Sequence, residues 1–502
     1  MMKLEQAREQ FKTIAARLKA YQYVLGLANW DMSTLAPPKG KQAAAKAIGV
    51  LSGERFAITV SPELREVVET ILANKDEATR VEVREAELLY EDMEKLEKIP
   101  KEEYQEYSEL QSTSMFVWED AKEQNDFDMF APYLEKILYF SRRFAKLTKP
   151  DMHPYNACLD DYEKGVTMTE LDAFFGAVRE KTVPLVERIA KDGRAIRDDF
   201  MLRTYPVDKQ EEISRRLLEL IGFDMKAGVM AASEHPFTNE ITTGDVRLTT
   251  HFYENMLTSA MLSTVHEGGH GLYEQHAQLS PVVGGTTLAT GVSMGIHESQ
   301  SRFYENSIGR SLPFWEYFFP ILKDAYPQQL ADVTLEEFYR AINIAKPGLI
   351  RIEADELTYN LHIMVRYELE KLLLEGSVAV KDLPRLWNEK YEAYLGVTPP
   401  DNARGVLQDV HWSGGMLGYF PSYALGNAYA AQMFATMRKT LDFDGLCRKG
   451  DLAPIGAWLN ENVHQYGCLK KPGELIVDIT GESLNPQYLT DYLQDKFEKV
   501  YF

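Results

Sequence analysis

The chain has 502 residues, of which 45% are hydrophobic and 26% are charged, as is usual for a globular protein. Its formal net charge of −21 at pH 7 argues against nucleic acid as the main partner, because phosphates would be repelled. The three cysteines (Cys158, Cys447 and Cys468) lie far apart and include no Cys-x-x-Cys pair, which argues against a disulfide framework and a thiolate zinc site.

The N-terminal segment has the pattern of an amphipathic helix and not of a secretory signal. Apolar residues recur at helical spacing over residues 3–25, and charged residues lie between them. No run in the sequence approaches the length needed to span a bilayer. We therefore expect a cytoplasmic protein with reduced cysteines and no membrane partner.

Helices are predicted for most of the first 230 residues. A Pro-Pro break at residues 37 and 38 precedes an Ala-rich helix, and residues 62–147 are rich in Glu, Lys, Leu and Tyr at helical spacing. Trp30 and Asp31 are interpreted as packing and capping residues. Loops are predicted near 149–156 and 203–206, and further helices at about 168–192 and 207–221.

Residues 234–253 carry the clearest strand pattern in the chain. Thr, Ile, Val and Leu alternate there with polar residues around a Gly-Asp turn, which predicts an antiparallel hairpin. An exposed strand in this hairpin could bind an extended peptide through main-chain hydrogen bonds. Helices return from about residue 296 and are interrupted by Gly/Pro-rich loops at 280–291, 397–405 and 413–421. The predicted fold is mostly α-helical with a small antiparallel sheet.

The hairpin leads directly into the sequence HEGGH at residues 266–270. Side chains four residues apart share one face of a helix, so His266 and His270 can bind the same zinc ion. Glu267 is placed to take a proton from metal-bound water. Gly268 and Gly269 each cost about 1 kcal/mol relative to alanine in a helix, so we expect the neighbouring strand or its ligand to pack closely there. The alternative is an accidental spacing of two histidines.

A catalytic zinc ion needs a third protein ligand and an open fourth position. Glu274 lies one turn beyond His270, but three ligands in one row of one helix would complete a tetrahedron poorly. Glu298 belongs to a second predicted helix and can approach from another side, so it is the preferred ligand. Glu274 is then expected to orient a histidine. His297, next to Glu298, is interpreted as structural or as a supporting residue.

Polar groups that could stabilise an oxyanion are dense in residues 405–434. His411, Tyr419 and Tyr423 lie there on a Gly-rich loop that leads into a predicted helix. Each tyrosine could instead pack with its hydroxyl group bonded locally.

Two arginines are candidates to bind a terminal carboxylate of a substrate through a bidentate contact. They are Arg351 in IRIEADELTYN and Arg247 in DVRLT. Either could instead form an ordinary salt bridge, Arg351 with Asp355 and Arg247 with Asp245.

Six short motifs occur in a fixed order across the second half of the chain. They are HPF at 235–237, DVRLT at 245–249, HEGGH at 266–270, HESQ at 297–300, IRIEAD at 350–355 and GVLQDVHW at 405–412. In this order they resemble the signatures of the carboxypeptidase Taq (M32) family of metallocarboxypeptidases, relatives of angiotensin-converting enzyme and the thimet-type oligopeptidases. The stretch YVLGLANWD and the chain length are similar too, so the resemblance covers essentially the whole chain.

The resemblance implies a mostly helical, prolate molecule of the gluzincin type. A deep central groove would divide a single peptidase domain into two lobes, a mainly helical N-terminal part (1–230) and a metal-binding catalytic part (231–502). The resemblance also implies a homodimer that removes single C-terminal residues from peptides, with broad specificity and poor action at proline.

The motifs also imply roles for individual residues. His266, His270 and Glu298 resemble the zinc ligands, Glu267 the general base, and Arg351 the group that fixes the free carboxylate of the substrate. His411 resembles the histidine of the last motif. Tyr423 stands twelve residues beyond it, the spacing of the oxyanion tyrosine in the oligopeptidase relatives, which favours Tyr423 over Tyr419. His235 of the HPF motif and Arg247 are further candidates for substrate binding.

The predicted function is that of a zinc-dependent metallocarboxypeptidase that uses Glu267-assisted attack of metal-bound water. One Zn²⁺ per subunit is expected, although Co²⁺ or Mn²⁺ can use the same ligands. The expected partners are peptides with a free C-terminus and a second copy of the chain. The alternatives are an endo-acting oligopeptidase on the same scaffold and a non-catalytic protein that binds a metal or a peptide.

Overall fold

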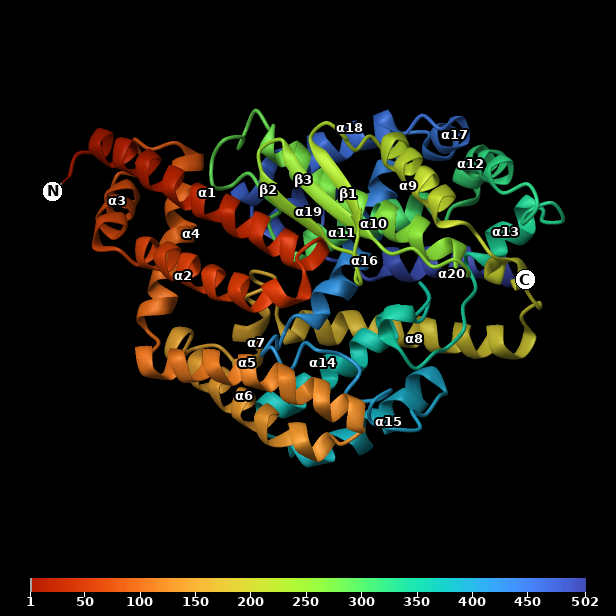
Figure 1. Ribbon diagram of the computed structural model, residues 1–502, viewed down its shortest axis with the longest axis horizontal. Helices are drawn as coiled ribbons and strands as arrows, with labels where there is room; N and C mark the ends of the chain where they lie inside the picture. The colour runs from red at the N-terminus through yellow and green to blue at the C-terminus, as the bar shows by residue number, and fades with distance from the viewer. Residues whose placement is uncertain (1) are drawn as a thin grey trace.

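The computed structural model describes residues 2–502 and is mostly helical, with a small sheet near the middle of the chain. In Figure 1 the first four helices form one end of the molecule, and α5, α6, α14 and α15 lie together on one side. The helices before the sheet are α1 (Leu4–Thr34), α2 (Lys41–Thr59), α3 (Pro62–Ala73), α4 (Arg80–Glu97), α5 (Lys101–Gln124), α6 (Phe127–Thr148), α7 (Pro154–Leu159), α8 (Met168–Asp192) and α9 (Val207–Ile221).

The chain after the sheet is also built from helices. They are α10 (Leu257–Gln278), α11 (Met294–Arg302), α12 (Leu312–Ala325), α13 (Leu335–Ala341), α14 (Tyr359–Glu375), α15 (Leu383–Leu395), α16 (Phe420–Met437), α17 (Phe443–Lys449), α18 (Ala453–Asn462), α19 (Pro472–Thr480) and α20 (Gln487–Tyr501). A π-helical segment, η3 (Phe303–Ile308), follows α11 directly. Short 3₁₀ turns are η1 (Pro38–Gly40), η2 (Asp199–Leu202), η4 (Arg351–Glu353), η5 (Val380–Asp382) and η6 (His464–Leu469).

The helices predicted at 168–192 and 207–221 are confirmed as α8 and α9. Thr167 forms a capping box with Glu170 at the start of α8, and Gly222 ends α9 in the left-handed conformation (φ 93°). The predicted N-terminal helix is longer than expected, because α1 continues to Thr34 through Trp30 and Asp31. Trp30 is buried and packs edge-on against Phe237, but the capping role expected for Asp31 is wrong, since only its carbonyl oxygen accepts bonds from the end of α1.

The predicted hairpin is confirmed and forms part of a three-stranded sheet. Strands β2 (Thr238–Thr242) and β3 (Asp245–Thr250) are antiparallel, and they turn at Gly244, whose φ of 81° favours glycine. A further strand, β1 (Gly228–Ala232), pairs in parallel with β3, so the strand order is β1-β3-β2. We did not expect β1, because its sequence GVMAA has no alternation of apolar and polar residues.

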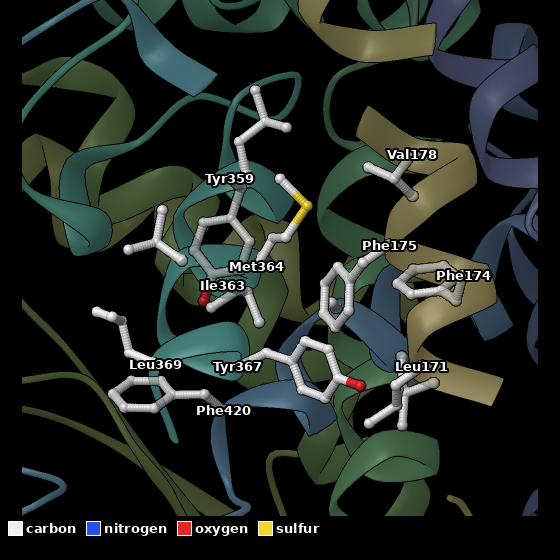
Figure 2. Close-up of a cluster of buried hydrophobic side chains, with 14 of the residues drawn as sticks. Leu171, Phe174, Phe175, Val178, Tyr359, Ile363, Met364, Tyr367, Leu369 and Phe420 are labelled. Atoms are coloured by element: carbon white, nitrogen blue, oxygen red, sulfur yellow. The ribbon is translucent and has the colours of Figure 1, made fainter. Parts of the chain in front are cut away.

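The largest hydrophobic core joins helices from distant parts of the sequence. Figure 2 shows side chains of α8 facing side chains of α14, and the ring of Phe175 stacks on that of Tyr367 with centroids 4.9 Å apart. A second core contains Leu218 and Ile221 of α9 together with Val265 of α10. Together these cores fix α10 and α14, which carry much of the site described below. No helix within residues 2–502 combines the length and the apolar composition needed to cross a membrane.

Both glycines in HEGGH lie where another helix approaches α10 closely. A Cβ atom at Gly268 would lie 2.5 Å from Ile221 Cδ1 of α9, and one at Gly269 would lie 2.7 Å from the carbonyl oxygen of Gln300 in α11. Close packing against this helix is therefore confirmed. The expectation that the strand or its ligand occupies the space is wrong, because helices α9 and α11 occupy it.

Replacing Gly269 with alanine should destabilise the protein. The added methyl group would meet the backbone of α11, which cannot move aside as a flexible side chain can, and such overpacking costs about 1–3 kcal/mol. Chemical denaturation should show this loss in the free energy of unfolding. Gly176→Ala in α8 is the matched control: its Cβ would meet nothing within 4 Å, so it should raise stability by up to about 1 kcal/mol. Equal effects of the two substitutions would contradict the packing argument.

Candidate active site

His266, His270 and Glu298 meet where α10 packs against α11. Their ligand atoms all lie within 4.8 Å of one another. Glu298 Oε2 lies 3.6 Å from His266 Nε2 and 3.4 Å from His270 Nε2. Two imidazole nitrogens and one carboxylate oxygen form a donor set typical of catalytic zinc sites. The structure therefore brings together the three side chains that the sequence predicts as ligands.

Each histidine is oriented by a hydrogen bond on the ring nitrogen that faces away from Glu298. His266 Nδ1 lies 2.9 Å from Glu305 Oε2, and His270 Nδ1 lies 2.6 Å from His297 Nδ1. His297 Nε2 in turn lies 2.7 Å from Glu274 Oε1. One tautomer set satisfies all three contacts, with each Nδ1–H of the two ligands donating outward and leaving Nε2 free for a metal. Glu274 thus orients a histidine, as predicted, through His297.

Sequence reasoning missed two charged side chains, Arg302, which binds Glu298, and Glu305, which binds Arg302. Arg302 Nε donates to Glu298 Oε1 at 2.7 Å, and its Nη1 lies 3.2 Å from Glu305 Oε2. Glu305 sits in the π-helical segment η3, a feature often found at functional sites. The only available signal was a second glutamate seven residues after Glu298, two helical turns along in an ordinary helix.

Glu298 and His270 are in the protonation states that bind a divalent cation, while Glu298 and Glu305 raise the pKa of His266, so that this ring gives up a proton when a metal binds. Burial alone would raise the pKa of Glu298, but Arg302 and the two histidines hold it well below its usual range, so the carboxylate is charged. Burial lowers the pKa of His270 to about 3, so this imidazole is neutral with a free lone pair. A charged carboxylate and a neutral imidazole are the forms that bind metals. The residues present therefore fit a metal ion of the zinc type.

Glu267 lies beside the ligands and is almost completely buried. Its Oε2 accepts a hydrogen bond of 2.7 Å from Thr238 Oγ1, and the same hydroxyl lies 2.9 Å from the carbonyl oxygen of Glu267. Strand β2 thereby sets the orientation of this carboxylate. Burial raises the pKa of Glu267, which makes it a stronger base than an exposed glutamate.

Helix α16 brings the candidate oxyanion groups toward the ligands. A Cβ atom at Gly426 would lie only 2.4 Å from Glu298 Cγ, so α16 touches the ligand directly. Tyr423 lies one turn earlier on the same helix, and its hydroxyl group lies 3.2 Å from His411 Nε2. Tyr419 stands at the start of α16, with its ring 5.2 Å from that of Tyr423. Burial lowers the pKa of His411 to about 4, so its ring is neutral.

Arg351 is nearly buried and pairs with Asp409. Its Nε donates to Asp409 Oδ1 at 3.0 Å, and its Nη1 donates to the Tyr359 hydroxyl at 3.2 Å. The ring of Tyr359 also lies 4.5 Å from the guanidinium carbon of Arg302, which connects Arg351 to the group that holds Glu298. The alternative salt bridge of Arg351 with Asp355 does not form. The carboxylate of Asp355 instead accepts bonds from the backbone of residues 346, 357 and 358 and from the Thr358 hydroxyl.

The remaining two substrate-binding candidates lie in or beside the sheet. Arg247 on β3 forms a bidentate pair with Asp245, at 2.8 and 2.7 Å, which is the salt bridge left open as its alternative. Its guanidinium carbon also lies 5.6 Å from the ring centroid of Trp30. His235 is exposed in the connection between β1 and β2, and its carbonyl oxygen accepts a bond from Ser233. Neither residue belongs to the group of side chains around Glu298.

The sequence profile of the carboxypeptidase Taq (M32) metallopeptidase family matches residues 10–497. The chain belongs to this family. It is 43% identical to "Carboxypeptidase 1" of Bacillus subtilis over 501 residues, which covers all of both chains. It is 38% identical to "Thermostable carboxypeptidase 1" of Thermus thermophilus over 97% of each chain.

The fold agrees with that of solved M32 structures. The crystal structure of an M32 carboxypeptidase from Deinococcus radiodurans superimposes with a TM-score of 0.95 at 35% identity, covering 98% of this chain and 99% of that one. The expected fold class and family are therefore confirmed, and the protein is an M32 metallocarboxypeptidase that requires a metal cofactor.

Proposed function

We propose that this M32 enzyme is a zinc carboxypeptidase that removes single C-terminal residues from peptides, with broad specificity and poor action at proline. The observation that carries the proposal is the convergence of His266, His270 and Glu298 beside a buried carboxylate, Glu267. One zinc ion per subunit would be held by the three converging side chains. Such an ion, when bound, supplies a Lewis acid that lowers the pKa of water to about 7.

Residues of the chain then provide the general base, the oxyanion donors and the orientation of the ligands. Glu267 accepts a proton from the attacking water and delivers it to the leaving amine, a role that its raised pKa and fixed orientation support. Tyr423 and His411 supply hydrogen-bond donors for the oxyanion that forms at the substrate carbonyl. Glu305, and His297 together with Glu274, hold the imidazole rings of the ligands in orientation.

The proposed preference for a chain end comes from Arg351. An arginine has five N–H donors. Arg351 Nε donates to Asp409 Oδ1, its Nη2 lies 2.9 Å from the same oxygen, and its Nη1 donates to the Tyr359 hydroxyl. The others remain for a carboxylate of the substrate. Because Tyr359 also packs on Arg302, which binds Glu298, a terminal carboxylate at Arg351 would lie close to the metal ligands.

A product ladder tests this function directly. Digestion of a synthetic peptide with a free C-terminus should yield products that differ by one residue, as measured by mass spectrometry. Treatment with a chelator should stop the reaction and added zinc should restore it. Internal fragments would support the endo-acting oligopeptidase instead, and no hydrolysis by the zinc-loaded protein would support a non-catalytic binding protein. The same peptide with an amidated C-terminus is the matched control and should be degraded far more slowly.

A further inference from the structure

A second arginine, Arg366, lies behind Arg351 and has no part in the mechanism above. It projects from α14 and is completely buried. Asp409 lies between the two guanidinium groups. Its Oδ1 accepts the Arg351 Nε–H at 3.0 Å, and its Oδ2 accepts the Arg366 Nε–H at 2.7 Å. The single carboxylate is therefore shared by two arginines.

Arg366 also supports Arg351 through a neutral residue. Gln408 Oε1 accepts a bond of 2.7 Å from Arg366 Nη2 and a bond of 2.9 Å from the backbone N–H of Arg351. Asp409 and Gln408, the two residues of the 405–412 loop that bind Arg351, are thus both hydrogen-bonded to Arg366. The Arg366 guanidinium is itself fixed by the carbonyl oxygen of His362, at 2.7 Å, and by the face of the Trp387 ring.

The three charges of Arg351, Asp409 and Arg366 sum to +1. Within residues 2–502, no acidic residue other than Asp409 lies within 4.0 Å of the guanidinium group of Arg351 or Arg366. An isolated Arg351–Asp409 pair would be neutral, and a neutral pair attracts a carboxylate weakly. In a buried setting such a difference of one charge is poorly screened by solvent.

We propose that Arg366 is a positioning residue whose charge offsets that of Asp409, so that Arg351 retains a net positive charge for the terminal carboxylate of the substrate. The proposal rests on the role proposed above for Arg351. Asp409 orients Arg351, and Arg366 prevents this orienting acid from cancelling its charge. Arg366 does not touch the substrate in this scheme.

The test compares KM and kcat for a peptide with a free C-terminus. Arg366→Met removes the charge and should raise KM by about tenfold or more while kcat stays within about threefold, because binding of the carboxylate is the same in the ground state and the transition state. Arg366→Lys retains the charge and should keep KM within about threefold of the wild-type value. An equal rise in both variants would overturn the proposal, since charge would then not be the cause.

A double variant restores the charge without restoring the contacts. Asp409→Asn combined with Arg366→Met returns the group to +1, so its KM should lie well below that of Arg366→Met alone. A double variant no better than the single one would overturn the proposal. If Arg366→Met fails to fold, Arg366→Lys still decides the matter: it keeps the group at +1, so it should bind the peptide with a KM close to the wild-type value, and a large rise would refute the charge argument.

Arg351→Ala separates this inference from the function on which it rests. It should raise KM for the free-acid peptide and leave the amidated peptide almost unaffected. If Arg351→Ala changes neither, the proposed role of Arg351 fails and the inference with it. If Arg351→Ala raises KM but Arg366→Met does not, only the inference about Arg366 fails. Thermal unfolding and zinc content, measured for every variant, exclude loss of the fold as the cause.

Discussion

Replacing Glu267 with glutamine should lower kcat by about a thousandfold while leaving the metal content unchanged. The amide has nearly the same shape as the carboxylate and can still accept the hydrogen bond from Thr238, but it cannot take a proton from water. Glu267 is not one of the three converging ligands, so zinc should remain bound. Steady-state hydrolysis of a peptide together with metal analysis of the same sample would measure both quantities.

Thr238→Val provides the matched control for this substitution. It removes the 2.7 Å hydrogen bond to Glu267 and keeps the carboxylate, so kcat should fall by no more than about tenfold. If the Glu267→Gln enzyme kept more than a tenth of the wild-type kcat, Glu267 would not be the general base. A Thr238→Val loss as large as that of Glu267→Gln would mean that orientation matters as much as basicity.

Substitution of Glu298 by glutamine should abolish stoichiometric zinc binding and, with it, activity. The change removes the charged oxygen that lies 3.6 and 3.4 Å from the two histidine Nε2 atoms. We expect zinc affinity to fall by more than the roughly 10–100-fold that is typical for loss of a supporting residue. Added zinc should then raise the unfolding temperature of the wild-type apoprotein but not that of the variant at the same zinc concentration.

Glu274→Gln tests the competing assignment, in which Glu274 is the third ligand. Glu274 contacts His297 and not the Nε2 atoms of the histidine pair, so its loss should weaken zinc binding by about 10–100-fold and leave a functional site at high zinc concentration. If Glu274→Gln abolished zinc binding and Glu298→Gln did not, the assignment of the ligands would have to be reversed.

Local patterns in the sequence predicted the parts of the structure that depend on neighbouring residues. The bounds of α8 and α9 follow from a capping box at Thr167 and a glycine at 222, which act within one helical turn. The pairing of His266 with His270 follows from helical spacing, and the choice of Glu298 over Glu274 follows from the geometry of a tetrahedron.

Contacts between distant segments could not be predicted in this way. Asp409 pairs with Arg351 across 58 residues and with Arg366 across 43, and neither separation corresponds to a local period. Asp355, which is close to Arg351 in sequence, was therefore the wrong expected partner. Glu305 reaches His266 from a π-helical segment, where the ordinary helical period no longer says which side chains share a face.

Two glycines, one on α10 and one on α16, contact α11, the helix that carries Glu298, from different sides. Gly269 of α10 meets the backbone of α11 at Gln300, and Gly426 of α16 meets Glu298 itself. The spacing between the histidine-bearing helix and the glutamate is thus determined by main-chain contact and not by the volume of interposed side chains. Substitutions among the bulky residues of the surrounding cores can therefore alter stability while the distances among the ligand atoms of His266, His270 and Glu298 stay the same.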